Sequence, residues 1–275
     1  MVALSGGAVK TVAGDGILTV DFRTDFAALP YSDTSGDTAI GFEVDILSEA
    51  ATRSELVMEP AESLGEFSPA ALHHLWLAEK GDVDVVAQGL FPGLYAYLEA
   101  YADDEQFRGI DAARAQSPAL FTDPYYLEDF GFAVNVELHP EIRSLADLEA
   151  GMTVATYEDA AADLWVVENL VPNGIDVSRV TNGSVLSPLS AAAFAGNVVG
   201  VIHSLPVIEV LAADIPEIEI VDVIDADVPV AFAVDPSNES LHEALNEALA
   251  GMVADGTYQT IYDRWFTNPA GSVVP

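Results

Sequence analysis

The chain has few cationic side chains, and these are the side chains best suited to binding an anionic ligand. It carries 9 Lys and Arg against 45 Asp and Glu. Arg114 precedes an aromatic stretch, Phe121–Tyr126, and Arg23 follows the first predicted strand. A guanidinium is a planar fork that can hold a carboxylate through two hydrogen bonds. Both arginines are therefore candidate anion-binding residues, although each could instead form an ion pair with one of the many acids.

Patterns typical of enzymes and metal sites are missing from the sequence. It has no Ser-His-Asp, P-loop or dinucleotide-binding signature. His73 and His74 are adjacent on a predicted helix, so they do not share a face. Asp222, Asp225 and Asp227 lack the spacing and the central glycine of a calcium loop. We therefore expect no catalytic residues, no metal and no cofactor.

The net charge of −36 restricts the partners of the chain. Such a charge excludes a nucleic-acid groove and an anionic membrane surface as natural partners. The 51% apolar content indicates a folded chain rather than a disordered acidic tail. Self-repulsion of this size weakens when salt screens it, and at ~1 M salt the Debye length is about 3 Å. We hypothesise that the protein is halophilic, that is, adapted to high salt.

The periodicity of apolar residues predicts two α/β lobes. Alternating strands and helices with short loops favour a mainly parallel sheet in each lobe. The first lobe has predicted strands at 17–22, 56–59 and 84–87 and helices at 41–54 and 69–80. The second has strands at 130–134, 153–156, 198–202 and 218–223 and helices at 159–170, 189–194 and 207–213. A strand at 228–234 returns towards the first lobe, and 240–266 forms two helices separated by Gly256.

Four motifs in series resemble the extracellular solute-binding proteins of amino-acid ABC importers. They are GFEVDI at 41–46, GDVDVV at 81–86, GIDAAR followed by FTDPYY at 109–126, and DGTYQTIYDRWF at 255–266. The resemblance covers about 16–266 and implies the two-lobed type II periplasmic-binding-protein fold, with two hinge crossings and a ligand cleft between the lobes. It implies that lobe 1 comprises 1–128 and 235–275, and lobe 2 comprises 129–234.

The same resemblance implies a function in uptake. A protein of this kind binds an amino acid or a related small carboxylate in the cleft and delivers it to an ABC transporter permease. It is extracellular or periplasmic, and we expect a monomer. Residues 1–10 lack the basic start and apolar core of a signal peptide, so either the protein is cytosolic or the sequence begins after a removed signal. The resemblance favours the second alternative, and such a signal can tether the protein to a membrane.

The resemblance places ligand-binding residues in lobe 1. Arg114 occupies the carboxylate-clamp position, and Arg23 stands where relatives recognise the ligand side chain. Phe26 and Tyr31 lie where the family stacks an aromatic ring on its ligand, and at least one of them should also belong to the lobe core. Three more candidates follow the third strand, where the family offers backbone groups and small polar side chains: Gln88, Gly89 and Phe91.

Lobe 2 departs from the family pattern at the ligand wall. Asp159 and Ala160 replace a Gly-Thr or Gly-Ser pair, and we expect Asp159 to be the N-cap of the following helix. Ser204, beside His203, replaces the aspartate that binds the ligand ammonium group, and Tyr157 can line the same wall. Either Asp159 supplies the ammonium partner, or the ligand is not an ordinary α-amino acid. We expect a negatively charged ligand to bind better than a cationic amino acid.

An enzyme on the same scaffold is the alternative. Some relatives are cyclohexadienyl dehydratases, whose reaction needs a general acid in a closed, desolvated cleft. Asp159 or His203 could serve as that acid while Arg114 holds the substrate carboxylate. A further departure is the inserted segment 92–108, which is either a surface helix on lobe 1 or places Tyr95 or Tyr97 over the cleft.

Overall fold

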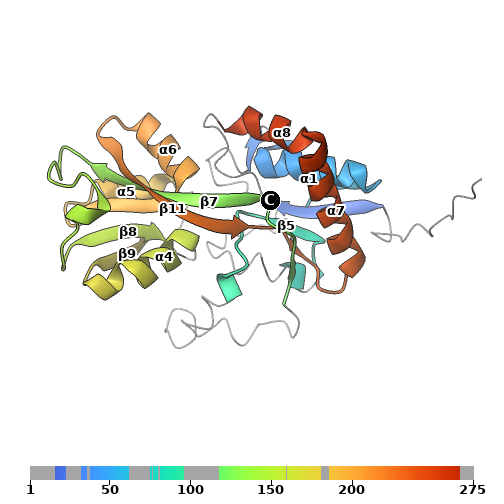
Figure 1. The fold of residues 1–275 in the computed structure, drawn as a ribbon, viewed down its shortest axis with the longest axis horizontal. Coiled ribbons are helices and arrows are strands. Elements are labelled where there is room, and N and C mark those ends of the chain that lie inside the picture. Colours follow the sequence, from blue (N-terminus) through green and yellow to red (C-terminus); the bar gives the residue numbers. More distant parts are fainter. Residues whose placement is uncertain are drawn as a thin grey trace, which may run out of the picture.

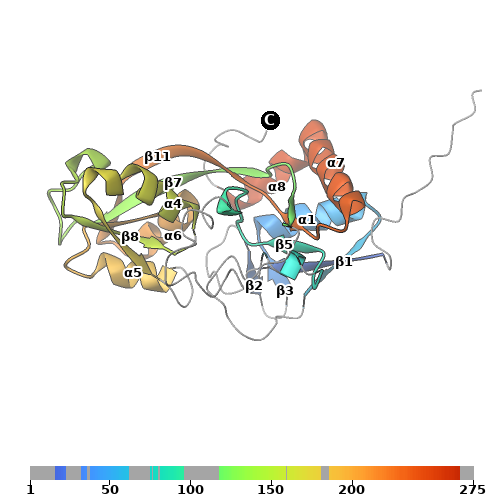
Figure 2. The ribbon, with the colours of Figure 1, turned by 90° about the horizontal axis from the view of Figure 1, so that it is seen from below.

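The computed structural model shows two five-stranded sheets, each with its own helices (Figure 1). It describes residues 16–22, 32–35, 38–61, 75, 77–79, 81–95, 118–158, 160–180 and 186–266. Two long antiparallel strands, β7 (Tyr126–Asn135) and β11 (Ile218–Val230), run from one group of elements towards the other (Figure 1, Figure 2). The predicted α/β class with two sheets is confirmed. The exact lobe boundaries stay a prediction.

The first sheet has the order β4-β1-β5-β12-β6. Strand β1 pairs in parallel with β4 and β5, whereas β12 pairs antiparallel with β5 and β6. Its strands are β1 (Ile17–Phe22), β4 (Val57–Pro60), β5 (Val85–Ala87), β6 (Leu120–Phe121) and β12 (Ala233–Val234). The helices α1 (Phe42–Arg53), α7 (Glu239–Asp255) and α8 (Thr257–Trp265) pack with this sheet, and a small hairpin joins β2 (Asp33–Ser35) to β3 (Thr38–Ile40).

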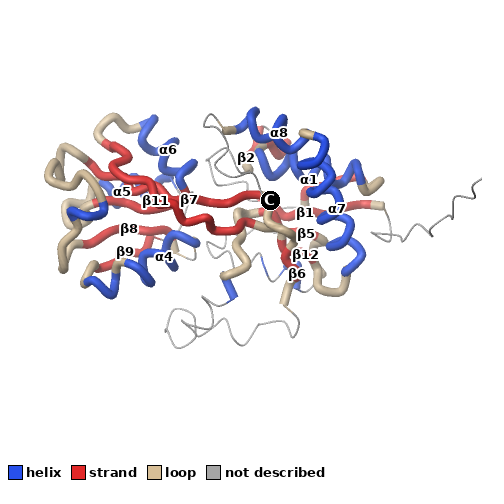
Figure 3. Tube along the Cα trace, in the orientation of Figure 1, coloured by secondary structure: helices blue, strands red, loops and turns tan. Residues whose placement is uncertain are grey.

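The second sheet has the order β11-β7-β10-β8-β9. Strands β10, β8 and β9 are parallel, and β7 lies antiparallel between β10 and β11. The remaining strands are β8 (Thr153–Tyr157), β9 (Asp176–Val180) and β10 (Gly200–Ser204). Helix α4 (Ala161–Asn169) packs on one face of this sheet, and α5 (Leu186–Ala193) and α6 (Leu205–Asp214) pack on the other (Figure 3). Two 3-10 turns span Leu145–Asp147 and Val171–Asn173.

The largest differences from the predicted elements concern the crossing strands. The strand predicted at 130–134 extends to ten residues, and the separate strands predicted at 218–223 and 228–234 are mostly one strand, β11, of 13 residues. Pairing along β7 supplies hydrogen-bond partners for this whole length. Two register shifts, at Ile220/Asp222 and Ile224/Val228, absorb the extra residues. The apolar periodicity is interrupted at these irregularities, and it therefore predicted two strands where the structure has one.

Two smaller corrections concern lobe 2. Strand β9 was not predicted, because its sequence, DVSRV, is polar and it lies at the edge of the sheet. Helix α4 begins at Ala161 with Ala160 as its N-cap, so the prediction that Asp159 caps this helix is wrong.

Among the described residues, no helix combines the length and the apolar character needed to span a bilayer.

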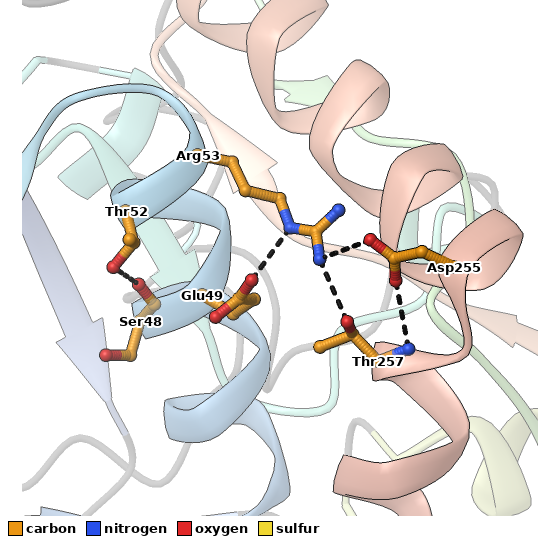
Figure 4. A network of polar contacts seen from close by, with 6 residues as sticks. All are labelled: Ser48, Glu49, Thr52, Arg53, Asp255 and Thr257. Atoms are coloured by element: carbon orange, nitrogen blue, oxygen red, sulfur yellow. Dashed lines mark hydrogen bonds and ion pairs between the residues drawn. The ribbon is translucent and has the colours of Figure 1, made fainter.

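Polar contacts fasten α1 to the two C-terminal helices (Figure 4). The Arg53 Nε atom lies 2.8 Å from Glu49 Oε1, and Arg53 Nη2 lies 2.9 Å from Asp255 Oδ2. The same Nη2 donates to Thr257 Oγ1 at 3.0 Å. Gly256, with φ of 83°, provides the left-handed turn between α7 and α8 that brings Asp255 and Thr257 to one arginine. The predicted helix stop at Gly256 is confirmed.

Candidate functional site

The carboxyl ends of two parallel strands, β8 and β10, bring three predicted site residues together. Tyr157 ends β8, and its ring lies 6.3 Å from that of His203, at an interplanar angle of 78°. Ser204 ends β10 and is the N-cap of α6. Carboxyl ends of parallel strands in open α/β sheets are where ligands bind. Tyr157, His203 and Ser204 therefore form a candidate ligand wall in lobe 2.

The hydrogen bonds of His203 fix its tautomer. The Ser204 N–H donates to His203 Nδ1 at 2.8 Å. Because Nδ1 is an acceptor here, a neutral His203 carries its proton on Nε2. Both residues are buried, with 5% and 2% of their surfaces exposed. This edge of the sheet thus carries an imidazole and a hydroxyl at the position where the family resemblance implies an aspartate.

Helix α4 places its N-terminus at the same edge through Ala160. The N-terminal turn of a helix presents backbone N–H groups and a positive partial charge. Ala160 has no side-chain acceptor to compete for these groups, and α4 packs against β10. The arrangement suits an anionic group.

A buried ion pair next to this edge was missed by the sequence analysis. Asp163 is fully buried and accepts hydrogen bonds from Thr156 Oγ1 at 2.9 Å and from Arg179 Nε at 2.9 and 3.0 Å. Thr156 and Arg179 are register partners on β8 and β9, so the network lies one residue from Tyr157. The scarcity of cations in the sequence was the available clue. Since Asp163 already neutralises Arg179, we assign the pair a structural role, in which it joins α4 to β9 beside the candidate ligand wall.

On lobe 1, two predicted residues follow strand β5. Gln88 is 7% exposed, and its Nε2 atom donates to Asp21 Oδ2 at 2.7 Å. Gly89 has a φ of 65°, a backbone conformation that favours glycine. Its N–H donates to Glu43 Oε1 at 2.8 Å. The predicted backbone donor is thus engaged by a buried carboxylate of the protein itself.

Phe91 and Tyr95 take structural positions in lobe 1. Phe91 is 5% exposed and belongs to an apolar cluster with Leu90 and Leu94. The Tyr95 hydroxyl donates to Glu79 Oε1 at 2.6 Å and accepts from the Ala119 N–H at 2.8 Å. These contacts favour the interpretation of Tyr95 as a residue packed on lobe 1. The role of Phe91 in ligand binding stays a prediction.

Several predicted site residues lie outside the described part of the chain, and their roles stay predictions. They are Arg23, Phe26, Tyr31, Arg114 and Asp159, together with Tyr97 of the inserted segment.

Three carboxylates meet on the paired strands β7 and β11, which run between the two sheets. Oxygen atoms of Asp129, Asp225 and Asp227 lie within 4.8 Å of one another, and Asp129 Oδ1 accepts from the N–H groups of Ala226 and Asp227 at 3.0 and 3.3 Å. Linear spacing could not bring Asp129 into this group. Three oxygen ligands fall short of the six to eight that calcium takes, and we assign no metal here.

Comparison with known proteins identifies the family. Residues 102–268, more than half of the chain, match the model of bacterial extracellular solute-binding proteins, family 3. The chain belongs to this family. The predicted family is therefore confirmed, and the motif FTDPYY and the C-terminal pattern both lie within the matched residues.

Individual relatives of this solute-binding protein agree with the family assignment. It is 57% identical over 37 residues to ABC transporter arginine-binding protein 1 of Escherichia coli (strain K12). That match spans 14% of this chain and 15% of the relative's length. Among solved structures, an ancestral arginine-binding protein bound to arginine has a TM-score of 0.69 and 23% identity, with 91% of this chain and 98% of that chain covered.

A second solved structure is relevant to the enzyme alternative. It is an ancestral amino acid-binding protein described as a precursor of cyclohexadienyl dehydratase, with a TM-score of 0.66 and 20% identity. The similarity covers 92% of this chain and 96% of that chain. Likenesses at these identities establish the fold, and the predicted two-lobed periplasmic-binding-protein fold is confirmed.

Proposed function

We propose that this solute-binding protein binds an amino acid or a related small carboxylate between its lobes and delivers it to the permease of an ABC importer. The observation that carries the proposal is the family match, which covers the crossing segment and all of lobe 2. The grouping of Tyr157, His203 and Ser204 at the strand ends of lobe 2 supports it. The amino-acid-binding relatives support the ligand class.

The proposed site divides the ligand between the lobes. Arg114 clamps the ligand carboxylate, Arg23 recognises its side chain, and Phe26 or Tyr31 stacks on it. Lobe 1 comprises 1–128 and 235–275, and lobe 2 comprises 129–234. Closure is a hinge motion in which a few residues of the crossing strands absorb the change in backbone angles. The protein acts as a monomer outside the cell or in the periplasm.

The ligand of this proposal is anionic rather than cationic. Ser204, beside His203, stands where the family resemblance implies an aspartate, so this position has no carboxylate. Two arginines near one cleft favour a net negative charge, because an unpaired charge in a closed cleft is costly. Asp159 is the residue that could reverse this preference. The relatives named for arginine bind a cationic amino acid, so they support the ligand class of amino acids but not the anionic preference, which rests on the residues of this chain.

The proposal is tested by ligand screening on the full chain. Thermal shift against the twenty L-amino acids and small mono- and dicarboxylates identifies binders, and calorimetry measures their Kd values. Arg114→Ala should lose most of the affinity. Arg143→Ala is the matched control, because Arg143 is 56% exposed and lies 3.7 Å from Glu219 on the surface of lobe 2. A screen without binders would contradict the function, and unchanged affinity in Arg114→Ala would contradict the clamp.

The dehydratase remains a second candidate because His203, a titratable side chain, lies at the predicted cleft wall beside Tyr157. The structural likeness to a dehydratase precursor adds support. Incubation with prephenate and with arogenate, followed by ultraviolet detection of an aromatic product, separates the two functions. Product formed by the wild type and lost in His203→Gln would replace the binding role with an enzymatic one.

A further inference from the structure

A buried acidic residue of helix α1 connects the ligand loop to the crossing between the lobes. Glu43 lies in the first turn of α1 and has 0% of its surface exposed. One atom, Oε1, accepts both the Gly89 N–H, at 2.8 Å, and the Tyr125 hydroxyl in a short hydrogen bond. A buried carboxylate is costly unless hydrogen bonds compensate it. These two donors are therefore held strongly.

The Gly89 end of this link belongs to the loop that follows β5. Gln88 is tied to β1 through Asp21, and Leu90 accepts the N–H of Ala231 at 2.9 Å. Ala231 lies between β11 and β12, on the return crossing. The loop 88–90 is thus fastened to the first sheet, to α1 and to the segment that comes back from lobe 2.

The Tyr125 end lies at the outgoing crossing, one residue before β7. Its N–H donates to Val230 O at 3.0 Å, and its carbonyl accepts from the Tyr258 hydroxyl at 2.6 Å. Its ring stacks on Phe232. Burial, followed by the negative charge of Glu43, raises the pKa of Tyr125 well above its ordinary value of 10.0. The hydroxyl therefore stays a donor at neutral pH.

We propose that Glu43 is a positioning residue that couples the ligand loop 88–90 to the crossing segments. The inference rests on the proposed function, in which this loop is part of the ligand site. One oxygen atom holds both donors, so a movement of Tyr125 during hinge motion displaces Gly89. In the other direction, a ligand that immobilises the loop 88–90 restricts the movement of Tyr125 at the crossing. Glu43 thereby links occupancy of lobe 1 to the angle between the lobes.

The test compares Glu43→Gln, Tyr125→Phe and the double variant with two controls. Glu43→Gln keeps the side-chain size but removes the charge, and Tyr125→Phe removes the hydroxyl alone. Asp45→Asn is the matched carboxylate control, since Asp45 lies on the same helix and binds Arg264 and Trp265 of α8. Tyr262→Phe is the matched hydroxyl control, because Tyr262 is also buried, in a ring cluster with Phe42 and Phe266.

Two measurements on the ligand-free full chain are made on every variant. Hydrogen exchange of the peptide covering 85–92 reports the Gly89 amide. Double electron–electron resonance measures the distance between spin labels attached at Glu168→Cys and Glu247→Cys, and this distance reports the angle between the lobes. Both label positions are exposed, and the chain has no natural cysteine, so labelling is specific.

Glu43→Gln replaces the charged acceptor of the Gly89 N–H by a weaker neutral one, and Tyr125→Phe removes the hydroxyl that holds this acceptor in place. Each should therefore speed exchange in 85–92 by about tenfold or more. Each should also broaden the interlobe distance distribution, and the double variant should add little to either single one. The two controls should change neither readout. An unchanged distance distribution in Tyr125→Phe would overturn the coupling, even if Glu43→Gln failed to fold. No ligand is used, so a failed ligand screen would overturn the proposed function alone.

Discussion

The ring of Tyr125 stacks on that of Phe232, with centroids 4.1 Å apart and planes at 14°. Tyr125 belongs to the segment that leaves the first sheet, and Phe232 to the segment that returns to it. The two residues lie 107 positions apart in numbering, yet their rings are the closest aromatic contact between the two crossings among the described residues. The two crossings therefore form one packed unit.

We predict that Phe232→Leu destabilises the protein by at least about 1 kcal/mol. Phe232 is fully buried, and an offset aromatic pair contributes about 0.5–1.5 kcal/mol beyond the area that it buries. Urea unfolding measures the change. Phe194→Leu is the control, because Phe194 is 48% exposed and should change the stability by less than about 0.5 kcal/mol. Equal effects of the two substitutions would contradict the importance of the stacked pair.

Gly200→Ala should destabilise lobe 2 by about 1–3 kcal/mol, the usual cost of overpacking. A Cβ atom at Gly200 would lie 2.5 Å from Phe132 Cε2 and 2.7 Å from the Ala133 carbonyl oxygen. The carbonyl belongs to the paired strand β7 and cannot move without breaking the sheet. Gly196→Ala, where a Cβ meets nothing within 4 Å, is the control. Differential scanning calorimetry of both variants should show a lower Tm for Gly200→Ala alone.

The Asp255 carboxylate should contribute to stability at neutral pH and lose this contribution in acid. Hydrogen bonds from Thr257, first from its side chain and then from its N–H, hold the pKa of Asp255 below its ordinary value of 3.8, and Arg53 adds to the effect. Because the folded-state pKa is lowered, the contribution is complete above the ordinary value and disappears as pH falls through the folded-state value.

Asp255→Asn should therefore be less stable than the wild type at neutral pH, with a difference that shrinks below pH 3.8. Denaturant unfolding at several pH values measures it. Glu247→Gln, an exposed substitution on the same helix, serves as the control. A difference between wild type and Asp255→Asn that stayed constant with pH would rule out this linkage.

The melting temperature should rise as sodium chloride increases from low to molar concentration. The net charge of −36 produces self-repulsion that added salt screens. Calorimetry in sodium chloride and in potassium chloride at matched ionic strength separates screening from effects of one particular cation. A melting temperature that did not rise with either salt would refute the proposed adaptation to high salt.

Acidic amino acids or small carboxylates should bind at least about tenfold more tightly than lysine or arginine, a difference of ~1.4 kcal/mol. The reason lies in the proposed site, in which Ser204 takes the place of the ammonium-binding aspartate that the family resemblance implies, and Arg23 and Arg114 are the proposed ligand-binding cations. Competition calorimetry at matched salt measures the order. If a basic amino acid bound most tightly, the ammonium contact would be reassigned to Asp159. Asp159→Asn should then abolish the binding of that amino acid.

The sequence by itself determined the family and the local elements. Strand β1, helix α1 and the stop at Gly256 followed from apolar periodicity and glycine chemistry, since these depend on neighbours in the chain. The motifs around FTDPYY and the C-terminal helices identified the solute-binding family, and the positions of Tyr157, His203 and Ser204 at strand ends followed from the same pattern.

Only the tertiary structure decided which polar residues are buried together. In the sequence, Glu43 looks like an ordinary acid in the first turn of a helix, and nothing local indicates that Gly89 and Tyr125 donate to it. The pairing of Asp163 with Arg179 depends in the same way on which elements pack against each other. The full length of β11 required its partner β7, because strand pairing is a contact between distant segments that periodicity within one segment does not contain.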